Sequence, residues 1–214
     1  MAVIQSGASS TTLMTVDPTN LAARVTLRPN ELTGSYRASL VSGTIAASTA
    51  AGILYTFKYT GTGVCIIRSV QVGEQVTTAY TAGSMRLGLY IVRTSFTQGT
   101  TNGTQTIFSV NKKRTSQSTP NASAVISTTT VITGDTTGSE DSVAYNHVLL
   151  SLPATITTTP VDGLRDFINP YSATSYPIVL AQNEGFRIKN DTAFAATGSG
   201  NLVVAVEWEE ATAY

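Results

Sequence analysis

Side chains that commonly carry out catalysis are few in this sequence and stand outside recognisable motifs. His147 is the single histidine, and it begins the apolar run His147-Val148-Leu149-Leu150. Nucleophilic catalysis needs a base such as histidine in contact with the nucleophile, and no Gly-x-Ser-x-Gly segment supplies a frame for one. A histidine without a motif is usually structural. We therefore expect His147 to be a half-buried or loop-edge histidine at the start of an apolar strand, and we expect a protein that is not an enzyme.

Acidic residues gather at three places and could act as paired carboxylates or bind calcium. The clusters are Asp135 with Glu140 and Asp141, Asp162 with Asp166, and Glu207 with Glu209 and Glu210. Glycosidases use two carboxylates that flank the scissile bond, but none of these clusters has a distinctive frame or the spacing of an EF-hand. In the first two clusters we expect solvated loop charges, with no metal and no cofactor. Glu207 and Glu209 alternate with Trp208, which predicts that both lie on the outer face of the final strand.

Nucleotide, nucleic-acid and redox chemistry also lack a motif. There is no Gly-x-x-x-x-Gly-Lys-Ser/Thr loop and no Gly-x-Gly-x-x-Gly after a strand. The basic run Lys112-Lys113-Arg114 has no interleaved aromatic residues, which favours a solvated loop tip over a nucleic-acid contact. Cys65 is the single cysteine, so a disulfide or a thiolate zinc site within the chain is excluded. Its apolar neighbours predict a buried thiol.

Composition points to strands and loops. Charged residues make up 12% of the chain, against about 25% in a typical globular protein, while Thr and Ser supply roughly a quarter. Thr is β-branched and suits a pleated, half-exposed surface. The 13 basic and 13 acidic residues give a net charge of 0, so no global field attracts nucleic acid or an anionic membrane. No apolar run approaches the length of a membrane span, and we expect neither partner.

The elements that must position these side chains are strands, about ten of them, separated by turns and without a convincing amphipathic helix. They are expected over residues 23–28, 35–41, 53–59, 64–76, 85–92, 125–133, 147–153, 178–180, 185–190 and 202–208. Residues 42–52 predict a loop, and a short helix over 161–168 is an alternative to irregular chain. The strict alternation at the end of the last strand places Trp208 on the face of Val204 and Val206.

This pattern predicts an all-β fold, a two-sheet antiparallel β-sandwich that could take the form of a jelly roll. Residues 1–23 predict an extended N-terminal arm, with a frayed terminus as the alternative. Residues 24–214 form a single β-sandwich domain with an irregular excursion around 94–142. Within it, Asn102-Gly103 is a hairpin turn signal that predicts pairing of residues 94–96 with 106–108, or of their neighbours.

Exposed aromatic side chains are the remaining candidates for a ligand site. Tyr171 and Tyr176 lie in the segment Asn169-Pro170-Tyr171-Ser172-Ala173-Thr174-Ser175-Tyr176-Pro177, which predicts a loop. Tyrosine rings in such a place can stack on sugars, and the alternative is that they pin the loop to the sandwich. These two residues are the possible ligand-contacting aromatics of the sequence.

Two blocks of strand and turn patterns lie on either side of the irregular middle. The first contains Arg24-Val25-Thr26-Leu27-Arg28-Pro29, Gly34-Ser35-Tyr36-Arg37, Ser42-Gly43-Thr44 and Leu54-Tyr55-Thr56-Phe57-Lys58. The second runs from Pro177-Ile178-Val179-Leu180-Ala181-Gln182-Asn183-Glu184 through Gly185-Phe186-Arg187-Ile188-Lys189-Asn190 to Val206-Glu207-Trp208-Glu209-Glu210. Together they cover about half of the chain, and they resemble virion structural proteins of tailed bacteriophages. The resemblance gives no functional residues.

The resemblance implies a β-rich component present in many copies in a phage particle. We expect a capsid decoration or cement protein that stabilises the head by binding the major capsid protein or other virion proteins. We also expect a homo-oligomer, with a trimer favoured, located in the virion after assembly in the host cytoplasm. The alternative is a receptor-binding module of the tail or a fibre that recognises host glycans through Tyr171 and Tyr176.

Overall fold

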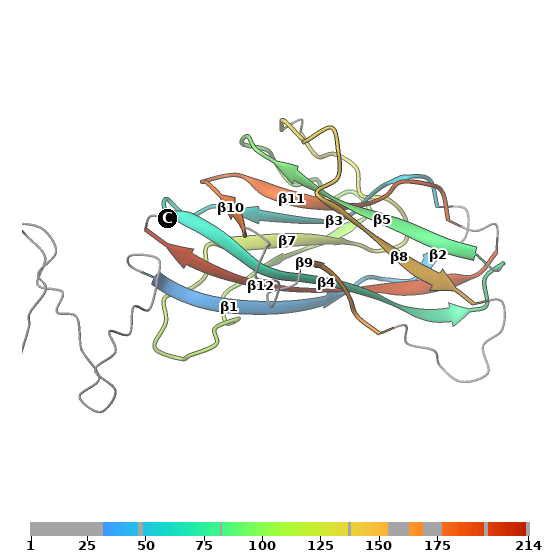
Figure 1. The fold of residues 1–214 in the computed structure, drawn as a ribbon, viewed down its shortest axis with the longest axis horizontal. Helices are drawn as coiled ribbons and strands as arrows, with labels where there is room; N and C mark the ends of the chain where they lie inside the picture. Colours follow the sequence, from blue (N-terminus) through green and yellow to red (C-terminus); the bar gives the residue numbers. More distant parts are fainter. Residues whose placement is uncertain are drawn as a thin grey trace, which may run out of the picture.

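The computed structural model of the 214-residue chain describes residues 32–46, 49–81, 83–136, 138–153, 163–168, 177–194 and 197–212. These residues form two antiparallel sheets and contain no helix. Sheet I contains β1 (Leu32–Val41), β2 (Ile45–Ala46), β4 (Val64–Thr78), β9 (Arg165–Ile168), β10 (Ile178–Leu180) and β12 (Ser199–Ala211). Sheet II contains β3 (Gly52–Tyr59), β5 (Gly83–Val92), β6 (Gly103–Ile107), β7 (Ala122–Ser127), β8 (Asn146–Leu152) and β11 (Gly185–Asn190). The sheets pack face to face as the predicted β-sandwich (Figure 1).

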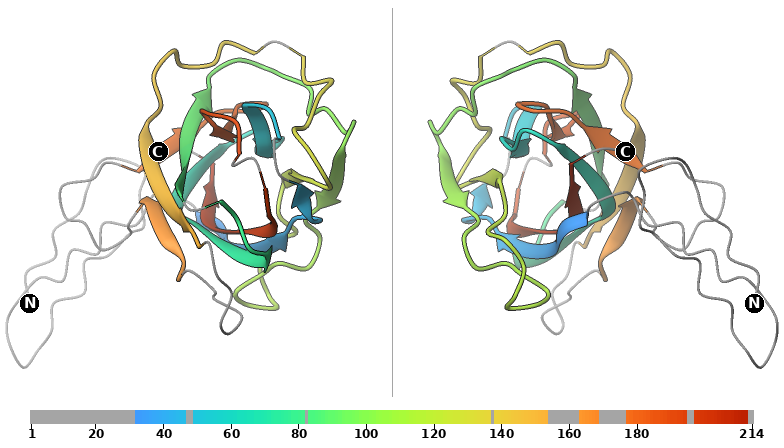
Figure 2. Two further views of the ribbon diagram at one scale, coloured as in Figure 1. Left: turned by 90° about the vertical axis from the view of Figure 1, so that its right-hand side faces the viewer. Right: turned by 90° about the vertical axis from the view of Figure 1, so that its left-hand side faces the viewer.

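The strand order is that of a jelly roll. Sheet I runs β1-β12-β4-β10, with β2 beside β12 and β9 beside β4, and sheet II runs β6-β7-β3-β11-β5-β8. The chain crosses between the sheets repeatedly: β1 lies in sheet I, β3 in sheet II, β4 in sheet I, β5 and β8 in sheet II, β9 and β10 in sheet I, β11 in sheet II and β12 in sheet I. This alternation builds two Greek keys. Seen end-on, the two sheets enclose the interior (Figure 2), and β6 and β7 widen sheet II beside β3.

An aromatic cluster joins the two sheets at the centre of the core. Trp208 on β12 is fully buried, and its ring centroid lies 5.5 Å from that of Tyr36, 5.4 Å from Phe57 and 5.2 Å from Phe108. Phe57 also stacks on Phe186 of β11, with ring centroids 5.2 Å apart. Such pairs contribute about 0.5–1.5 kcal/mol each beyond the burial of their area, so this cluster fixes how the sheets face each other.

The last strand confirms its predicted alternation. Val204, Val206 and Trp208 are buried together, whereas Glu207 and Glu209 lie on the partly exposed outer face. Most of the other predicted strands are also confirmed, with ends that differ by a few residues. Two local predictions are wrong. The 42–52 loop contains the short strand β2, which pairs with β12, and residues 165–168 form β9 beside β4 where a short helix was considered.

The excursion is more ordered than its sequence suggests, and its predicted hairpin pairing is wrong. Asn102 does adopt the left-handed conformation of a turn, with φ of 60°. However, β6 pairs with β7, from Gly103 opposite Ser127 to Ile107 opposite Ser123. Residues 94–96 cannot be its partner because this part of the chain crosses the outer face of sheet II, where Phe96 is buried. The first predicted strand, at 23–28, and the predicted arm at 1–23 lie outside the described residues.

Candidate functional site

A buried charge cluster fastens the excursion to the outer face of sheet II. Arg187 on β11 donates from Nε to Asp135 Oδ2 at 2.8 Å and from a guanidinium nitrogen to Glu140 Oε2 at 2.9 Å. The Arg187 side chain is 8% exposed and lies 5.1 Å above the ring of Phe96. Lys189, two residues further along β11, forms an ion pair with the other oxygen of Glu140. We call Asp135, Glu140, Arg187 and Lys189 the Arg187 cluster.

The Arg187 cluster overturns the expectation of solvated loop charges for Asp135 and Glu140. Their side chains are only 6% and 18% exposed, and Asp135 also accepts a hydrogen bond from the backbone N–H of Gly99. Asp141 keeps its predicted exposed character, since it pairs with Arg93 at the surface. The sequence did contain a signal. Arg187 and Lys189 alternate with the apolar residues of β11, so both cations had to meet acceptors on the outer face of a central strand.

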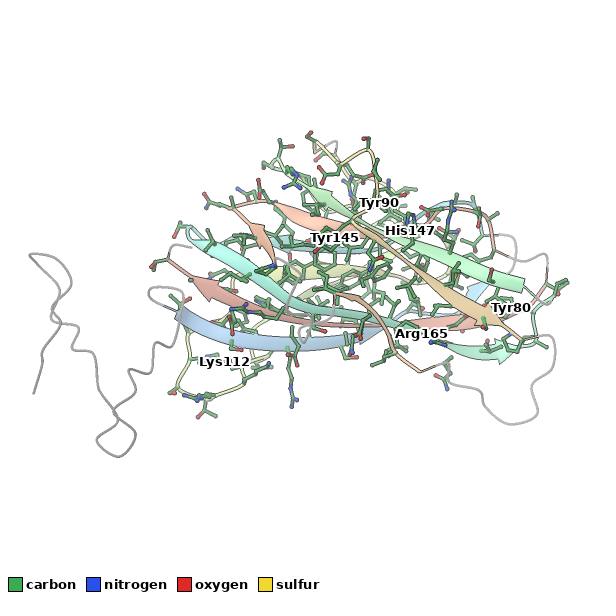
Figure 3. All side chains as sticks on the ribbon, viewed as in Figure 1. Tyr80, Tyr90, Lys112, Tyr145, His147 and Arg165 are labelled. Carbon is green, nitrogen blue, oxygen red and sulfur yellow. The ribbon has the colours of Figure 1, made fainter. Side chains whose placement is uncertain are left out.

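His147 belongs to a second polar cluster on the same sheet, where β8 lies beside β5. Its Nε2 atom lies 3.0 Å from Oδ2 of Asp191, and Arg86 Nε contacts the same oxygen at 3.1 Å. Tyr90 donates its hydroxyl to Asp191 Oδ1 at 2.7 Å, and Lys189 Nζ lies 4.5 Å from the centre of the tyrosine ring. Figure 3 shows Tyr90 and His147 close to each other over these strands. His147 lies at the start of β8, as its sequence position predicts, and its side chain is 42% exposed.

The chemistry of this second cluster is that of a hydrogen-bond network. Burial, followed by the hydrogen bond to Asp191, raises the pKa of Tyr90 to about 12. The hydroxyl therefore stays protonated at neutral pH and donates to the carboxylate, which is the opposite of what an activated nucleophile requires. Asp191 thus joins side chains from β5 and β8 to the end of β11.

Glu210 is a buried carboxyl group that the sequence did not single out from its acidic neighbours. It is 1% exposed, and it accepts hydrogen bonds from the backbone and side chain of Asn121 at 2.8 and 2.9 Å and from Trp208 Nε1 at 3.1 Å. Burial, and then the charge of Glu210, raise the pKa of the Cys65 thiol. The predicted buried character of Cys65 is confirmed, since it is 0% exposed.

The remaining predicted site residues have different outcomes. Tyr171 and Tyr176 lie outside the described residues, so the aromatic platform stays a prediction. The basic run at 112–114 lies against β1 and is not a free loop tip, because the backbone N–H of Lys113 donates to Ser35. Lys113 Nζ also pairs with Glu207 at 2.8 Å. Of the second acidic cluster, Asp162 lies outside the described residues, and Asp166 accepts a hydrogen bond from Gln71 at 2.8 Å.

Exposed apolar side chains gather at the edges of the two sheets. The seven large ones in the described part of the chain are Val41, Ile107, Val110, Val143, Tyr145, Leu149 and Leu164. Each lies on or within a few residues of β1, β6, β8 or β9, and among the described residues none of these strands has neighbours on both sides in its sheet. Val110 is 83% exposed, Ile107 73% and Leu149 61%. The edges are therefore the surfaces where this protein has apolar area left to bury.

In comparisons with known proteins, no family model, curated protein or solved structure matches this chain. Within the described ranges, no group of three or more His, Cys, Asp or Glu side chains is arranged to hold a metal ion. The same part of the chain contains no helix that is long and apolar enough to cross a membrane. The candidate functional surface is therefore taken from the geometry alone, as the apolar edges of the sandwich.

Proposed function

We propose that this chain is a structural protein of a tailed-bacteriophage virion, namely a decoration or cement protein of the head. In this role it binds the major capsid protein and neighbouring copies of itself, as a trimer. It acts through surface contacts, without catalysis and without a cofactor, and it joins the particle during assembly in the host cytoplasm. The observation that carries the proposal is the placement of exposed apolar side chains at the strand edges.

Apolar edges suit a protein that is surrounded by neighbours. An unpaired strand edge offers backbone N–H and C=O groups to another chain, and proteins that stay monomeric usually protect such edges with charge or proline. On β8, which is the outermost strand at one end of sheet II, Leu149 is 61% exposed. Full burial of one leucine or valine side chain contributes about 1.5–3 kcal/mol. A few such residues per contact, repeated over many copies, stabilise a shell.

The internal ion pairs support the same role. Arg187 and Asp135 hold the excursion on sheet II, and Asp191 links β5 and β8 to the end of β11, so these charges serve the rigidity of the domain. A rigid, neutral sandwich can be placed in many equivalent positions without a large rearrangement. The net charge of 0 gives little repulsion between adjacent copies.

The alternative function, a tail or fibre module that binds host glycans through Tyr171 and Tyr176, gains no support from the described residues because both tyrosines lie outside them. Quantitative mass spectrometry of gradient-purified particles from the source of this sequence tests the leading proposal. The expected result is a chain that is present in many copies, in fixed ratio to the major capsid protein. A chain that is absent from the particles, or present in the few copies typical of a fibre, would contradict it.

A further inference from the structure

The outer face of sheet I carries a hollow of about 610 Å³ that the proposed virion role does not use. Its lining comes from β1, β12, β4 and β9 and from one residue of the excursion, Asn111. The volume lies within the range of roughly 300–1,000 Å³ that is typical of sites for small ligands.

Small side chains on three neighbouring strands form the floor of this hollow. Ser39 on β1 lies opposite Ala205 on β12, and Ala205 lies opposite Gln71 on β4. In the next row, Glu207 lies between Arg37 and Ser69. Because outward-facing positions of a sheet normally carry longer polar side chains, two small residues side by side lower the surface here.

Longer polar side chains stand around this floor and supply both donors and acceptors. Arg37 brings a guanidinium group, and Asn111 brings an amide. Gln71 donates from Nε2 to Oδ1 of Asp166 at 2.8 Å, which orients the carboxylate from β9. Glu207 is held by Lys113 at 2.8 Å. The lining thus contains one guanidinium group and two carboxylates, and one of these carboxylates is already paired with Lys113.

Ser69 adds a hydroxyl group to the lining of the hollow. The residue is 6% exposed and lies on the outer face of β4. A hydroxyl group can both donate and accept a hydrogen bond, so Ser69 offers a ligand both kinds of contact.

We propose that this hollow binds a neutral saccharide, as a short segment of a glycan. Vicinal hydroxyl groups both donate and accept, which matches a lining made of amides, hydroxyls, one guanidinium and two carboxylates. The two carboxylates of the lining disfavour an anion, and the Cβ atom of Ala205 gives an apolar floor for the C–H face of a sugar ring. This site is separate from Tyr171 and Tyr176 and does not depend on the virion proposal.

The test uses the full chain on a glycan array that carries neutral, sialylated and sulfated oligosaccharides, followed by titration calorimetry with the best neutral ligand. Ala205→Gln fills the floor and should weaken binding at least about tenfold. Ser69→Ala removes one hydroxyl and should weaken it about threefold or more. Val203→Gln makes the same kind of change on the same face of β12 outside the hollow, and it should bind like the unmodified protein.

Binding of a neutral glycan that Ala205→Gln and Ser69→Ala weaken, and that Val203→Gln leaves intact, supports the site. Three results overturn it: no neutral glycan binds, only sialylated or sulfated glycans bind, or binding survives both substitutions in the hollow. Circular dichroism confirms the fold of each variant, and Ser69→Ala keeps the test decisive if Ala205→Gln does not fold. A negative array would leave the mass spectrometry of the particles unaffected.

Discussion

Replacing Arg187 by glutamine removes the cation that fastens the excursion to sheet II. The Arg187 side chain is 8% exposed and holds Asp135, which is 6% exposed, at 2.8 Å. Removing one partner of a buried ion pair costs about 3–5 kcal/mol, because the other charge stays buried without compensation. For a domain of this size each kcal/mol lowers Tm by about 2–4 °C, so we expect a fall of roughly 6–20 °C.

A matched substitution at Arg93, which also pairs with a carboxylate of the excursion, separates burial from charge. Arg93 forms a two-point pair with Asp141, but the two side chains are 58% and 33% exposed. Exposed pairs contribute about 0–1 kcal/mol, so Arg93→Gln should have a small effect. Urea unfolding, followed by the fluorescence of the buried Trp208, measures both variants. If Arg187→Gln and Arg93→Gln differed by less than about 1 kcal/mol, the buried role assigned to Arg187 would be wrong.

Three other predictions concern packing and ionisation. A Cβ atom at Gly185 would lie 1.9 Å from a backbone oxygen of β3. Gly185→Ala should therefore lower the free energy of unfolding by about 1–3 kcal/mol. Gly163 has open space around it, so the control Gly163→Ala should change the free energy of unfolding little. The Cys65 thiol, buried and with a raised pKa, should react with a thiol reagent only at the rate of unfolding, and fast labelling of the native protein would contradict this. Burial raises the pKa of Tyr59 to about 12, as it does for Tyr90. When folding raises the pKa of an acid, the stability that results is fully present below the pKa of the group in the unfolded chain, which is about 10 for tyrosine. This stability is lost as pH rises from there to about 12. Urea unfolding at pH 7, 9 and 11 should show this loss, and it should be smaller in Tyr59→Phe.

Periodicity carried most of the fold prediction. In β12, Val204, Val206 and Trp208 alternate with outward-facing residues, and this local pattern fixes both the strand and its buried face. Local patterns do not state which strands become neighbours. Asn102-Gly103 forms a turn, as its sequence predicts. However, the strand that follows it, β6, pairs with β7, because residues 94–96 before the turn lie over the outer face of sheet II.

The burial of charge was the main feature that sequence reasoning missed. Asp135 and Glu140 look like solvated loop residues, because their partner Arg187 lies about fifty positions further along the chain. Glu210 was grouped with Glu207 and Glu209, but the alternation that places Trp208 inside also places Glu210 on the inward face, where Asn121 satisfies it. Alternation therefore marks Arg187, Lys189 and Glu210 as positions that need partners. Which residues supply these partners depends on tertiary packing, for which local composition gives no signal.

The central claim is that the edges of this sandwich contact neighbouring virion proteins. Cryo-electron microscopy of particles that contain the chain tests it most directly. We predict density for the sandwich on the head surface, with Ile107 of β6 or Leu149 of β8 buried against the major capsid protein or another copy of the chain. Density found only on the tail, or density on the head in which both of these edges face solvent, would contradict the account.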